Sequence, residues 1–565
     1  MVTKYDSFER SARLLREEFN EKGISKECEM SAASNRDLII KIESDIDCEF
    51  LNTPLMELEF SQSIWTLLSV MEDRYLKITA IKPIPIEQQH AYIDTLVNSL
   101  AHPVRALFRK KSESNSKITK RLIDDHYQWS QEWIDSSIIY NAFNLIFPLW
   151  HKKKINLTIT GNYIDTGDLD VDGEKYGYEA YNRIIRKDGD LPESYFDVES
   201  VIESVMQNIS VSGESFTLNF NPKLVALLVK TYSRSLDGRH VLPKDWKIGE
   251  VSFDDFKIVF TTIQAMLHGW FIARVNVAGR GLPGLGYSSA VWIVGSKELI
   301  ARLSRYTSID KKKIATILDY LKFANHNIRD PDIAIQPLLE INSEEFALSP
   351  LLWINTNAER NFCTLLNKIP SEREAYLSLT LNKEEILYQE LREILERLGY
   401  EVTRGRLRST DVDLSIIDRK NKICICVELK WFIEPAEIRE TIERSIELEK
   451  GVRQSSLIMS LFKSGDKQLF RLLGVDNTYR FSSFVGSRNW IGHSDVQTPE
   501  IPIIKIWHFI KKLMELDSLE GALNWLESKS YLPINGQDYR VIPVNLDTGS
   551  WKSRWYGIAN WPPSG

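Results

Sequence analysis

The chain has 565 residues, of which 43% are hydrophobic and 26% are charged, and its formal net charge is −7. These values are typical of soluble globular proteins of several domains and exclude disordered, collagen-like and strongly basic chains. Any nucleic-acid partner would therefore be bound by a local patch. The five cysteines are scattered without CxxC spacing, so we expect neither a zinc knuckle nor a disulfide framework, and we predict a reducing, cytoplasmic location.

The first 150 residues predict a mixed α/β region. Residues 1–19 have the pattern of a charged amphipathic helix without a signal core, and no apolar run in the chain reaches the roughly 18 residues of a membrane span. Alternation in DLIIKIES (37–44) indicates a strand. The aromatic run at 127–150 predicts one buried helix or a pair of helices. The basic stretch at 108–121 is an exposed loop or a linker.

Residues 151–375 predict a second, α+β or α/β region that serves recognition or regulation. The pieces INLTIT, SFTLNF, FKIVFT and AVWIV are strand-like, and KKKIATILDYLKFAN (311–325) is helical. A break at 367–374 precedes a strongly helical stretch, so we place a third domain at 376–565.

Two short motifs in the middle region match patterns for binding calcium and a dinucleotide. The first matches an EF-hand loop, in which calcium would take its oxygens at fixed spacing around a tight glycine turn. Its preceding segment is strand-like, so we favour an acidic turn. The second has the glycine spacing of a dinucleotide fingerprint, but no helix follows it, so we favour a flexible loop. Their residues are Asp168, Asp170, Asp172, Gly173 and Glu179, and Gly279, Gly281 and Gly284.

The order of secondary-structure elements is easier to predict in the third domain than in the first two. A helix is predicted over Lys383–Leu398, closed by Gly399, and the strand GYEV follows it. The strands DVDLSII and ICICVELK then form a hairpin about the turn at 418–421. A helix from Pro435 to about Arg453 and a strand in IPIIKIW (501–507) complete the order α-β-β-β-α-β.

Alternation along the hairpin separates polar side chains from apolar ones. Successive strand residues point to opposite faces, so Asp413 is expected on one face of the first strand and Glu428 and Lys430 on one face of the second. Folding the hairpin places Asp413 opposite Glu428 or one diagonal step away. The first face also takes Asp411 and Ser415, its opposite takes Val412, Leu414 and Ile416, and Cys424 and Cys426 share the face of Glu428.

Two carboxylates this close repel each other, and a divalent cation removes the conflict. Mg²⁺ binds through one or two carboxylates with water and phosphate oxygens, which fits Asp413, Glu428 and the carbonyl of Leu429. Lys430, on the same face, can orient or deprotonate a water molecule and offset charge on a phosphate. The pattern therefore predicts a site for Mg²⁺ or Mn²⁺ and a phosphate-bearing substrate.

This set, Asp413-x14-Glu428-x-Lys430 on a hairpin after a helix and a GYEV strand, resembles the core of the PD-(D/E)xK nucleases, which have a restriction-endonuclease-like fold. The resemblance covers about residues 380–515. It implies metal-dependent hydrolysis of a phosphodiester, with Asp413 and Glu428 as metal ligands and Lys430 as the catalytic lysine. The proline of the motif is absent, since Thr410 and Val412 flank Asp411.

Two further side chains have a role in such nucleases and an ordinary explanation as well. A carboxylate of the preceding helix often joins the site, and Glu384 falls on that helix's apolar face, whereas Glu385 lies off it. A capping box at Asn382–Glu385 would account for the same acids without catalysis. Gln454 matches the place of a site Gln or basic residue, or it is a solvated helix end.

Basic and aromatic residues near the site also leave two interpretations open. Arg404, Arg406 and Arg408 alternate before Asp411 and would either line a groove for a nucleic-acid backbone or form a solvated loop. The tail WKSRWYGIANWPP (551–563) could stack on bases, but we favour packing on the protein.

The leading hypothesis is a cytoplasmic, metal-dependent DNA endonuclease with a large N-terminal region. Restriction or anti-phage defence is an analogy drawn from the superfamily. The alternative is a non-catalytic nucleic-acid-binding or assembly protein with a nuclease-like fold. A protein partner or a homo-oligomer is compatible with both hypotheses.

Overall fold

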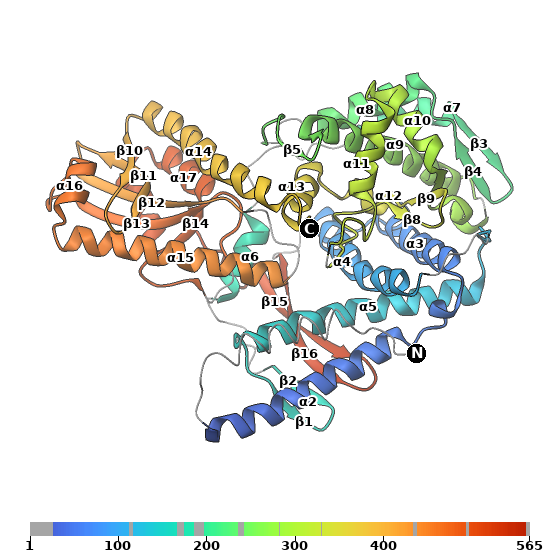
Figure 1. Ribbon diagram of the computed structural model, residues 1–565, viewed down its shortest axis with the longest axis horizontal. Coiled ribbons are helices and arrows are strands. Elements are labelled where there is room, and N and C mark those ends of the chain that lie inside the picture. The colour runs from blue at the N-terminus through green and yellow to red at the C-terminus, as the bar shows by residue number, and fades with distance from the viewer. Residues whose placement is uncertain are drawn as a thin grey trace.

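The computed structural model has two lobes side by side and a layer beneath them (Figure 1). It is mixed α/β with several small sheets, in agreement with the predicted class. We call the three parts the helical lobe, the sheet lobe and the base layer. The predicted helix at 1–19 and Pro435 lie outside the described residues, which are 26–111, 117–166, 175–185, 197–235, 242–281, 283–328, 330–432, 438–492 and 496–560.

The helical lobe has one apolar core, to which residues on both sides of position 150 contribute, from Phe50 to Tyr376. Three short sheets lie around its helices: β3 with β4, β5 with β6, and β7-β9-β8. Its elements are α3 (Phe60–Leu76), α4 (Ile86–Lys110), the first half of α5 (Asp124–His151), α7 (Glu199–Gln207), β3 (Ile209–Ser212), β4 (Ser215–Leu218), α8 (Pro222–Ser235), β5 (Lys247–Ile248), β6 (Val251–Ser252), α9 (Phe253–Gly279), β7 (Trp292–Gly295), α10 (Ser296–Thr307), α11 (Lys311–Leu321), β8 (Leu339–Glu340), β9 (Glu345–Leu348), α12 (Pro350–Ile354) and α13 (Ala358–Lys368).

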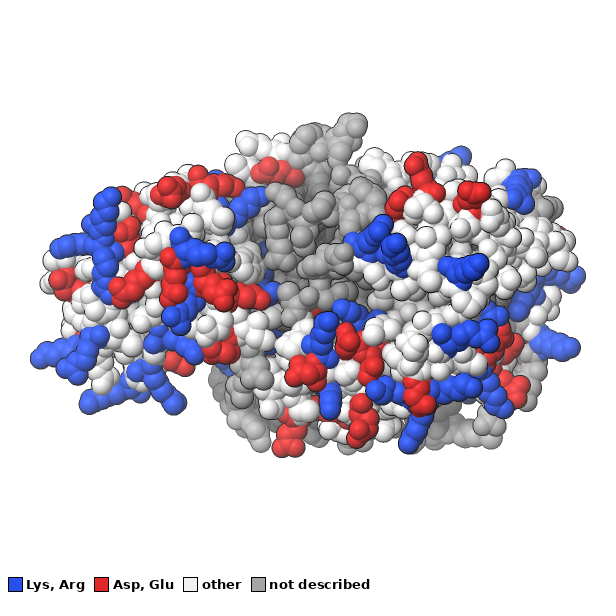
Figure 2. All heavy atoms as spheres, turned by 90° about the horizontal axis from the view of Figure 1, so that it is seen from above, with Lys and Arg blue, Asp and Glu red and all other residues white. Residues whose placement is uncertain are grey.

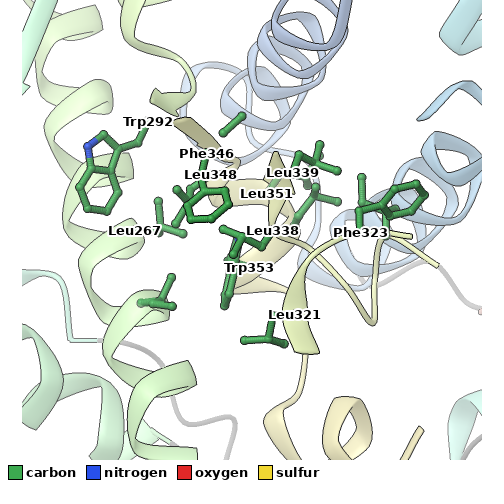
Figure 3. Packing of buried hydrophobic residues seen from close by; sticks show 14 of the residues in the cluster. Leu267, Trp292, Leu321, Phe323, Leu338, Leu339, Phe346, Leu348, Leu351 and Trp353 are labelled. Carbon is green, nitrogen blue, oxygen red and sulfur yellow. The ribbon is translucent and has the colours of Figure 1, made fainter. Parts of the chain in front are cut away.

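Helix α9 runs through the centre of this lobe. Figure 3 shows Leu267 of α9 beside Phe346, Leu348 and Trp353, all members of the core. Within the described residues α9 is the one helix long and apolar enough to cross a membrane, and 78% of its apolar window is buried inside the protein. Its place in the core accounts for its composition.

Two segments predicted as strands are parts of helices. FKIVFT lies inside α9, where Phe256, Val259 and Phe260 are buried at helical spacing and Ile258 is exposed, and so short an apolar segment does not distinguish a helix from a strand. DLIIKIES lies inside α2 (Lys26–Leu51), and the buried residues Ile39, Ile42 and Ile46 of this helix recur at helical spacing. Four further secondary-structure predictions for this half are confirmed. Strands form within INLTIT, SFTLNF and AVWIV, and the aromatic run is a single helix. The helix predicted at 311–325 spans Lys311–Leu321.

The base layer joins distant parts of the chain. Its sheet has the order β1-β2-β16-β15, in which β16 runs parallel to β2. Trp551 and Trp555 pack on its core with Ile39 and Phe143, so this part of the aromatic tail packs on the protein as predicted, and residues 561–563 lie outside the described residues. Helix α2 and the second half of α5 cover this sheet. Helix α6 (Lys175–Ile184) packs between the base layer and the sheet lobe. The strands are β1 (Thr158–Thr160), β2 (Tyr163–Asp165), β15 (Tyr539–Asp547) and β16 (Lys552–Asn560).

The sheet lobe is a five-stranded sheet with the order β10-β11-β12-β13-β14. Strand β11 is antiparallel to both β10 and β12, and β13 and β14 run parallel to β12. Helices α14 and α17 cover one face, and α15 and α16 cover the other (Figure 1). The elements are α14 (Arg373–Arg397), β10 (Glu401–Arg406), β11 (Asp411–Asp418), β12 (Ile423–Lys430), α15 (Ile438–Lys463), α16 (Lys467–Leu473), β13 (Arg480–Ser487), β14 (Ile503–Lys505), α17 (Ile506–Leu516) and α18 (Leu519–Glu527).

The order of elements is α14-β10-β11-β12-α15-α16-β13-β14, which contains the predicted α-β-β-β-α-β in sequence, with four differences. Helix α16 was not predicted. Helix α14 begins at Arg373, ten residues before the predicted start, and α15 continues through SSLIMSLF to Lys463. Strand β13 was not predicted, because RFSSFVGS has neither regular alternation nor a continuous apolar run. The predicted strand in IPIIKIW is β14, which ends where α17 begins.

Candidate active site

Pairing between β11 and β12 brings the two predicted carboxylates together. Leu414 lies opposite Val427 and Ser415 opposite Cys426, so Asp413 and Glu428 are the next pair along the ladder. The amide N–H of Leu429 donates to Asp413 Oδ2 at 2.9 Å, which fixes the carboxylate beside the end of β12. The predicted opposition of Asp413 and Glu428 is therefore present in the fold.

A β-bulge in β11 changes which of its side chains share a face, compared with the prediction. Thr403 lies opposite Ser415 and Gly405 opposite Val412, so two residues of β11 face the single residue Arg404. The extra residue shifts the alternation, and Val412 packs with Cys424 and Cys426 instead of with Leu414 and Ile416. The prediction for Val412 was wrong for this reason. Bulges of this kind redirect a side chain, here that of Asp413.

Glu428 and Lys430 form a nearly buried ion pair at the end of β12. Lys430 Nζ donates to Glu428 Oε1 at 2.6 Å, and the side chains are 18% and 1% exposed, respectively. Glu428 Oε2 is buried and has no hydrogen-bond partner among the described residues. A buried carboxylate oxygen without a donor is free to accept a cation.

Gly451 of α15 lies directly over this pair, a role that was not predicted from the sequence. A Cβ at this position would meet Glu428 Cγ and Lys430 Cε at 3.3 Å each. Glycine costs about 1 kcal/mol relative to alanine inside a helix, so a glycine in the middle of EKGVRQ was a sign of close backbone approach. It lets α15 cover the pair without displacing it.

The charges of the site are strongly coupled. Burial raises the pKa of Glu428 to about 8, with the charge of Asp413 adding to the rise and Lys430 opposing it. Burial also raises the pKa of Asp413, which the N–H of Leu429 and the charge of Lys430 partly offset. Burial alone would lower the pKa of Lys430, but the charges of Glu428 and Asp413 outweigh it and raise the pKa. The site therefore retains a proton on its carboxylates unless another cation replaces it.

The donor set fits a hard divalent cation. Asp413, Glu428 and the Leu429 carbonyl supply oxygens, and the free Oε2 of Glu428 is the clearest ligand atom. Among the described residues no three His, Cys, Asp or Glu side chains converge closely enough to hold a metal. An ion here would complete its shell with water or phosphate oxygens, as Mg²⁺ commonly does.

Glu384 is brought to this site by α14, and Glu385 is not. Glu384 is exposed, yet partial loss of solvation raises its pKa, with the charges of Asp413 and Asp411 adding to the rise and Lys430 opposing it. Glu385 accepts from Arg404 at 2.6 Å, which lowers its pKa. Because α14 begins at Arg373, these acids lie in mid-helix and the capping-box explanation was wrong.

The remaining predicted side chains lie around the site without joining it. Gln454 is half-buried one turn after Gly451, and its side chain makes no hydrogen bond within the described part of the chain. Arg404 stacks on the ring of Tyr388 at 4.1 Å, in addition to its pair with Glu385. Arg406 and Arg408 are exposed at the end of β10 and in the loop after it. On the face seen in Figure 2, basic and acidic side chains are interspersed, so a nucleic-acid contact on that face would be local.

The two competing motifs lie elsewhere. Residues 167–174 of the EF-hand match lie outside the described residues, and Glu179 accepts from the hydroxyl of Tyr556 at 2.7 Å. A strand, β2, precedes this segment as predicted. In the glycine motif, Gly279 ends α9 and a 3₁₀ helix (Pro283–Ser289) stands where we expected a flexible loop. The strand, turn and α-helix of a dinucleotide site are not formed there.

Comparisons with known proteins do not place the chain in a family. No protein-family model matches it, no curated protein is similar to it, and no solved structure is similar to it. The likeness to PD-(D/E)xK nucleases therefore rests on the site residues and on the order of the elements that hold them.

Proposed function

We propose that this protein is a metal-dependent nuclease that hydrolyses phosphodiester bonds, with DNA as its substrate and with the sheet lobe as a restriction-endonuclease-like catalytic domain. One observation carries the proposal: Asp413 and Glu428 oppose each other at the end of β12, with Lys430 bonded to Glu428 at 2.6 Å. Three such charges in a largely buried place are costly for stability, and a catalytic site is a reason to keep them.

The roles of the residues follow from their surroundings. Asp413, Glu428 and the Leu429 carbonyl would hold Mg²⁺ or Mn²⁺. When bound, the ion would activate a water molecule and stabilise charge on the phosphate. Lys430 has a raised pKa, so it stays protonated and acts as a hydrogen-bond donor that orients water and offsets negative charge, rather than as a base. Glu384 faces the same charges and can accept a hydrogen bond from that water.

Cleavage assays with Lys430→Ala test the proposal. The full-length protein is incubated with duplex DNA, single-stranded DNA and RNA in Mg²⁺, Mn²⁺ or EDTA. We expect metal-dependent cleavage by the wild type and a loss of about 10²–10⁴-fold in the variant. Lys420→Ala, an exposed lysine in the turn of the same hairpin, is the matched control and should cleave like the wild type. Equal cleavage by Lys430→Ala and wild type would refute the assignment.

A non-catalytic nucleic-acid-binding or assembly protein is the second candidate. It is favoured by the closed Lys430–Glu428 pair, which can serve stability alone. Nucleic-acid binding in EDTA, with no cleavage of any substrate in Mg²⁺ or Mn²⁺, would support it. Restriction or anti-phage defence in the cytoplasm, with a protein partner or as a homo-oligomer, is the setting that we propose by analogy for the first candidate.

A further inference from the structure

Helix α14 is shared by the cores of the two lobes. Near its start Tyr376 is buried in the helical lobe, and further along Leu387, Leu391 and Leu395 are buried in the sheet lobe. Glu384, which faces the candidate site, lies between these two parts. A displacement of the helical lobe would therefore be transmitted to the site through one continuous helix.

Lys383, the residue before Glu384, is enclosed where the lobes meet. It is 3% exposed. Its ammonium lies 5.4 Å from the ring centre of Trp246, 5.6 Å from that of Tyr376 and 5.7 Å from that of Trp431. A cation within about 6 Å of an aromatic ring is attracted to its face, and the attraction strengthens when water is excluded. Trp246 belongs to the helical lobe, whereas Trp431 directly follows Lys430.

Arg488 connects the same tryptophan to the end of β12. Its guanidinium lies 4.0 Å from the ring centre of Trp431, and it donates to Glu390 of α14 at 2.9 Å. Its backbone N–H donates to the carbonyl of Lys430 at 2.8 Å. Lys383 and Arg488 thus both contact Trp431, and Arg488 also holds the main chain of Lys430.

We propose that Lys383 is a positioning residue through which the helical lobe controls the candidate site: its ammonium, held by Trp246, fixes Trp431 and with it the position of Lys430. This inference rests on the proposed nuclease function. It assigns the large N-terminal half of the chain a regulatory role, in which its contact with α14 and Trp431 keeps the site competent. Disturbing Trp246 should act on cleavage although Trp246 lies in the other lobe.

The test compares Lys383→Met, which keeps the length and removes the charge, with Lys383→Arg, which keeps both charge and ring contacts. We expect kcat to fall about tenfold or more in Lys383→Met with KM nearly unchanged, and to recover in Lys383→Arg. Trp246→Leu should lower kcat in the wild-type background but add little in the Lys383→Met background, because both changes break one contact. Lys512→Met is the control. Lys512 of α17 makes a similar contact, with its ammonium 5.6 Å from the ring centre of Trp525 on α18.

A second measurement does not depend on cleavage. Amide hydrogen exchange of Leu429–Phe432, measured without nucleic acid, should accelerate in Lys383→Met and Trp246→Leu and stay unchanged in Lys512→Met. Wild-type kcat and exchange in Lys383→Met, or strictly additive effects of the two changes, would overturn the inference. A wild type that cleaves nothing while exchange still responds to Lys383→Met would refute the nuclease function and leave the mechanical link established.

Discussion

Two glutamates, one in each lobe, have similar burial, hydrogen bonding and pKa shifts. Glu72 of α3 is 0% exposed and Glu428 of β12 is 2% exposed. In each, Oε1 accepts hydrogen bonds and Oε2 is buried with no partner among the described residues. Burial is the main cause that raises both pKa values, to about 7 for Glu72 and to about 8 for Glu428.

The surroundings of the two acids differ. Glu72 accepts from the hydroxyl of Ser349 and from the N–H of Leu351 at 2.9 Å, and the nearby Arg274 is 0% exposed and bound to Asp73. Those groups are enclosed by helices α3, α9 and α12. Glu428 instead lies beside the half-buried Asp413 and Lys430, and the exposed Glu384 faces them. A raised pKa in a buried acid therefore does not mark a site by itself, and access from solvent to a second carboxylate distinguishes the two.

Replacing each acid by its amide gives the largest expected contrast. Glu428→Gln should lose most metal-dependent cleavage and the stabilisation by Mg²⁺, which for the wild type we expect to raise Tm by about 2–4 °C. Glu72→Gln keeps the acceptor for Leu351 and should retain both properties. Thermal unfolding with increasing Mg²⁺ measures the shift. If both variants lost the Mg²⁺ response equally, the distinction between the two acids would fail.

The pH dependence of folding stability distinguishes the same two acids, because burial raises the pKa of Glu428 to about 8 and that of Glu72 to about 7. A carboxyl group whose pKa is raised on folding contributes stability that is complete below its unfolded pKa, near 4.5, and is lost as pH rises through the folded pKa. Metal-free stability should therefore fall between pH 4.5 and about 8, and Glu428→Gln should flatten the part of the curve near pH 8. Since Mg²⁺ must displace the proton of Glu428, its affinity should weaken about tenfold for each pH unit below 8.

A smaller effect is expected from the acid on α14. Glu384→Gln should lower kcat about tenfold, because it removes a carboxylate that faces the charges of Asp413 and Lys430. Glu385→Gln is the matched control, since Glu385 is engaged with Arg404 and should change kcat by less than about threefold. Both are measured with saturating Mg²⁺. Equal losses in the two variants would mean that α14 acts through its stability instead of through Glu384.

The smallest effect concerns access of substrate to the open site. Arg406→Ala and Arg408→Ala should each weaken DNA binding about threefold and reduce the salt slope of log Kobs by about 0.9, if each contacts one phosphate. Arg404→Ala should change the slope less, because Glu385 already neutralises Arg404. Fluorescence anisotropy in EDTA, with Lys430→Ala as the background, measures these slopes. Unchanged slopes in both variants would assign these arginines to a solvated loop.

The sequence predicted the hairpin and its charges because alternation over two adjacent strands needs no knowledge of the rest of the fold. It failed at Val412, where the bulge shifts the alternation by one residue, and bulges leave no regular signal in a single sequence. It also failed at FKIVFT, because a short apolar segment of a helix and a buried strand have similar patterns. Glu384 was left between two explanations, since the true start of α14, at Arg373, was not apparent.

The contacts that join the two lobes could not be predicted from local sequence patterns. No local pattern marks Lys383 as a buried residue, and only Trp246 and Trp431, which come from distant segments, enclose it. The same holds for Glu72 and Arg274, whose charges are compatible with a core only because their partners come from other elements. Such long-range contacts depend on tertiary packing, which periodicity does not encode.

The sheet of the base layer has a consequence for biosynthesis. Thr166 donates to the carbonyl of Arg554, 388 positions later in the chain. At a synthesis rate of about 5–20 residues per second, β2 would wait roughly 20–80 s on the ribosome before β16 exists. The helical lobe, whose core ends at Tyr376, can fold within that time, whereas the sheet lobe is complete only shortly before β16. Meanwhile an unpaired strand edge stays exposed and is able to capture neighbouring nascent chains. Slow translation or crowded polysomes should therefore favour intermolecular strand pairing of this protein.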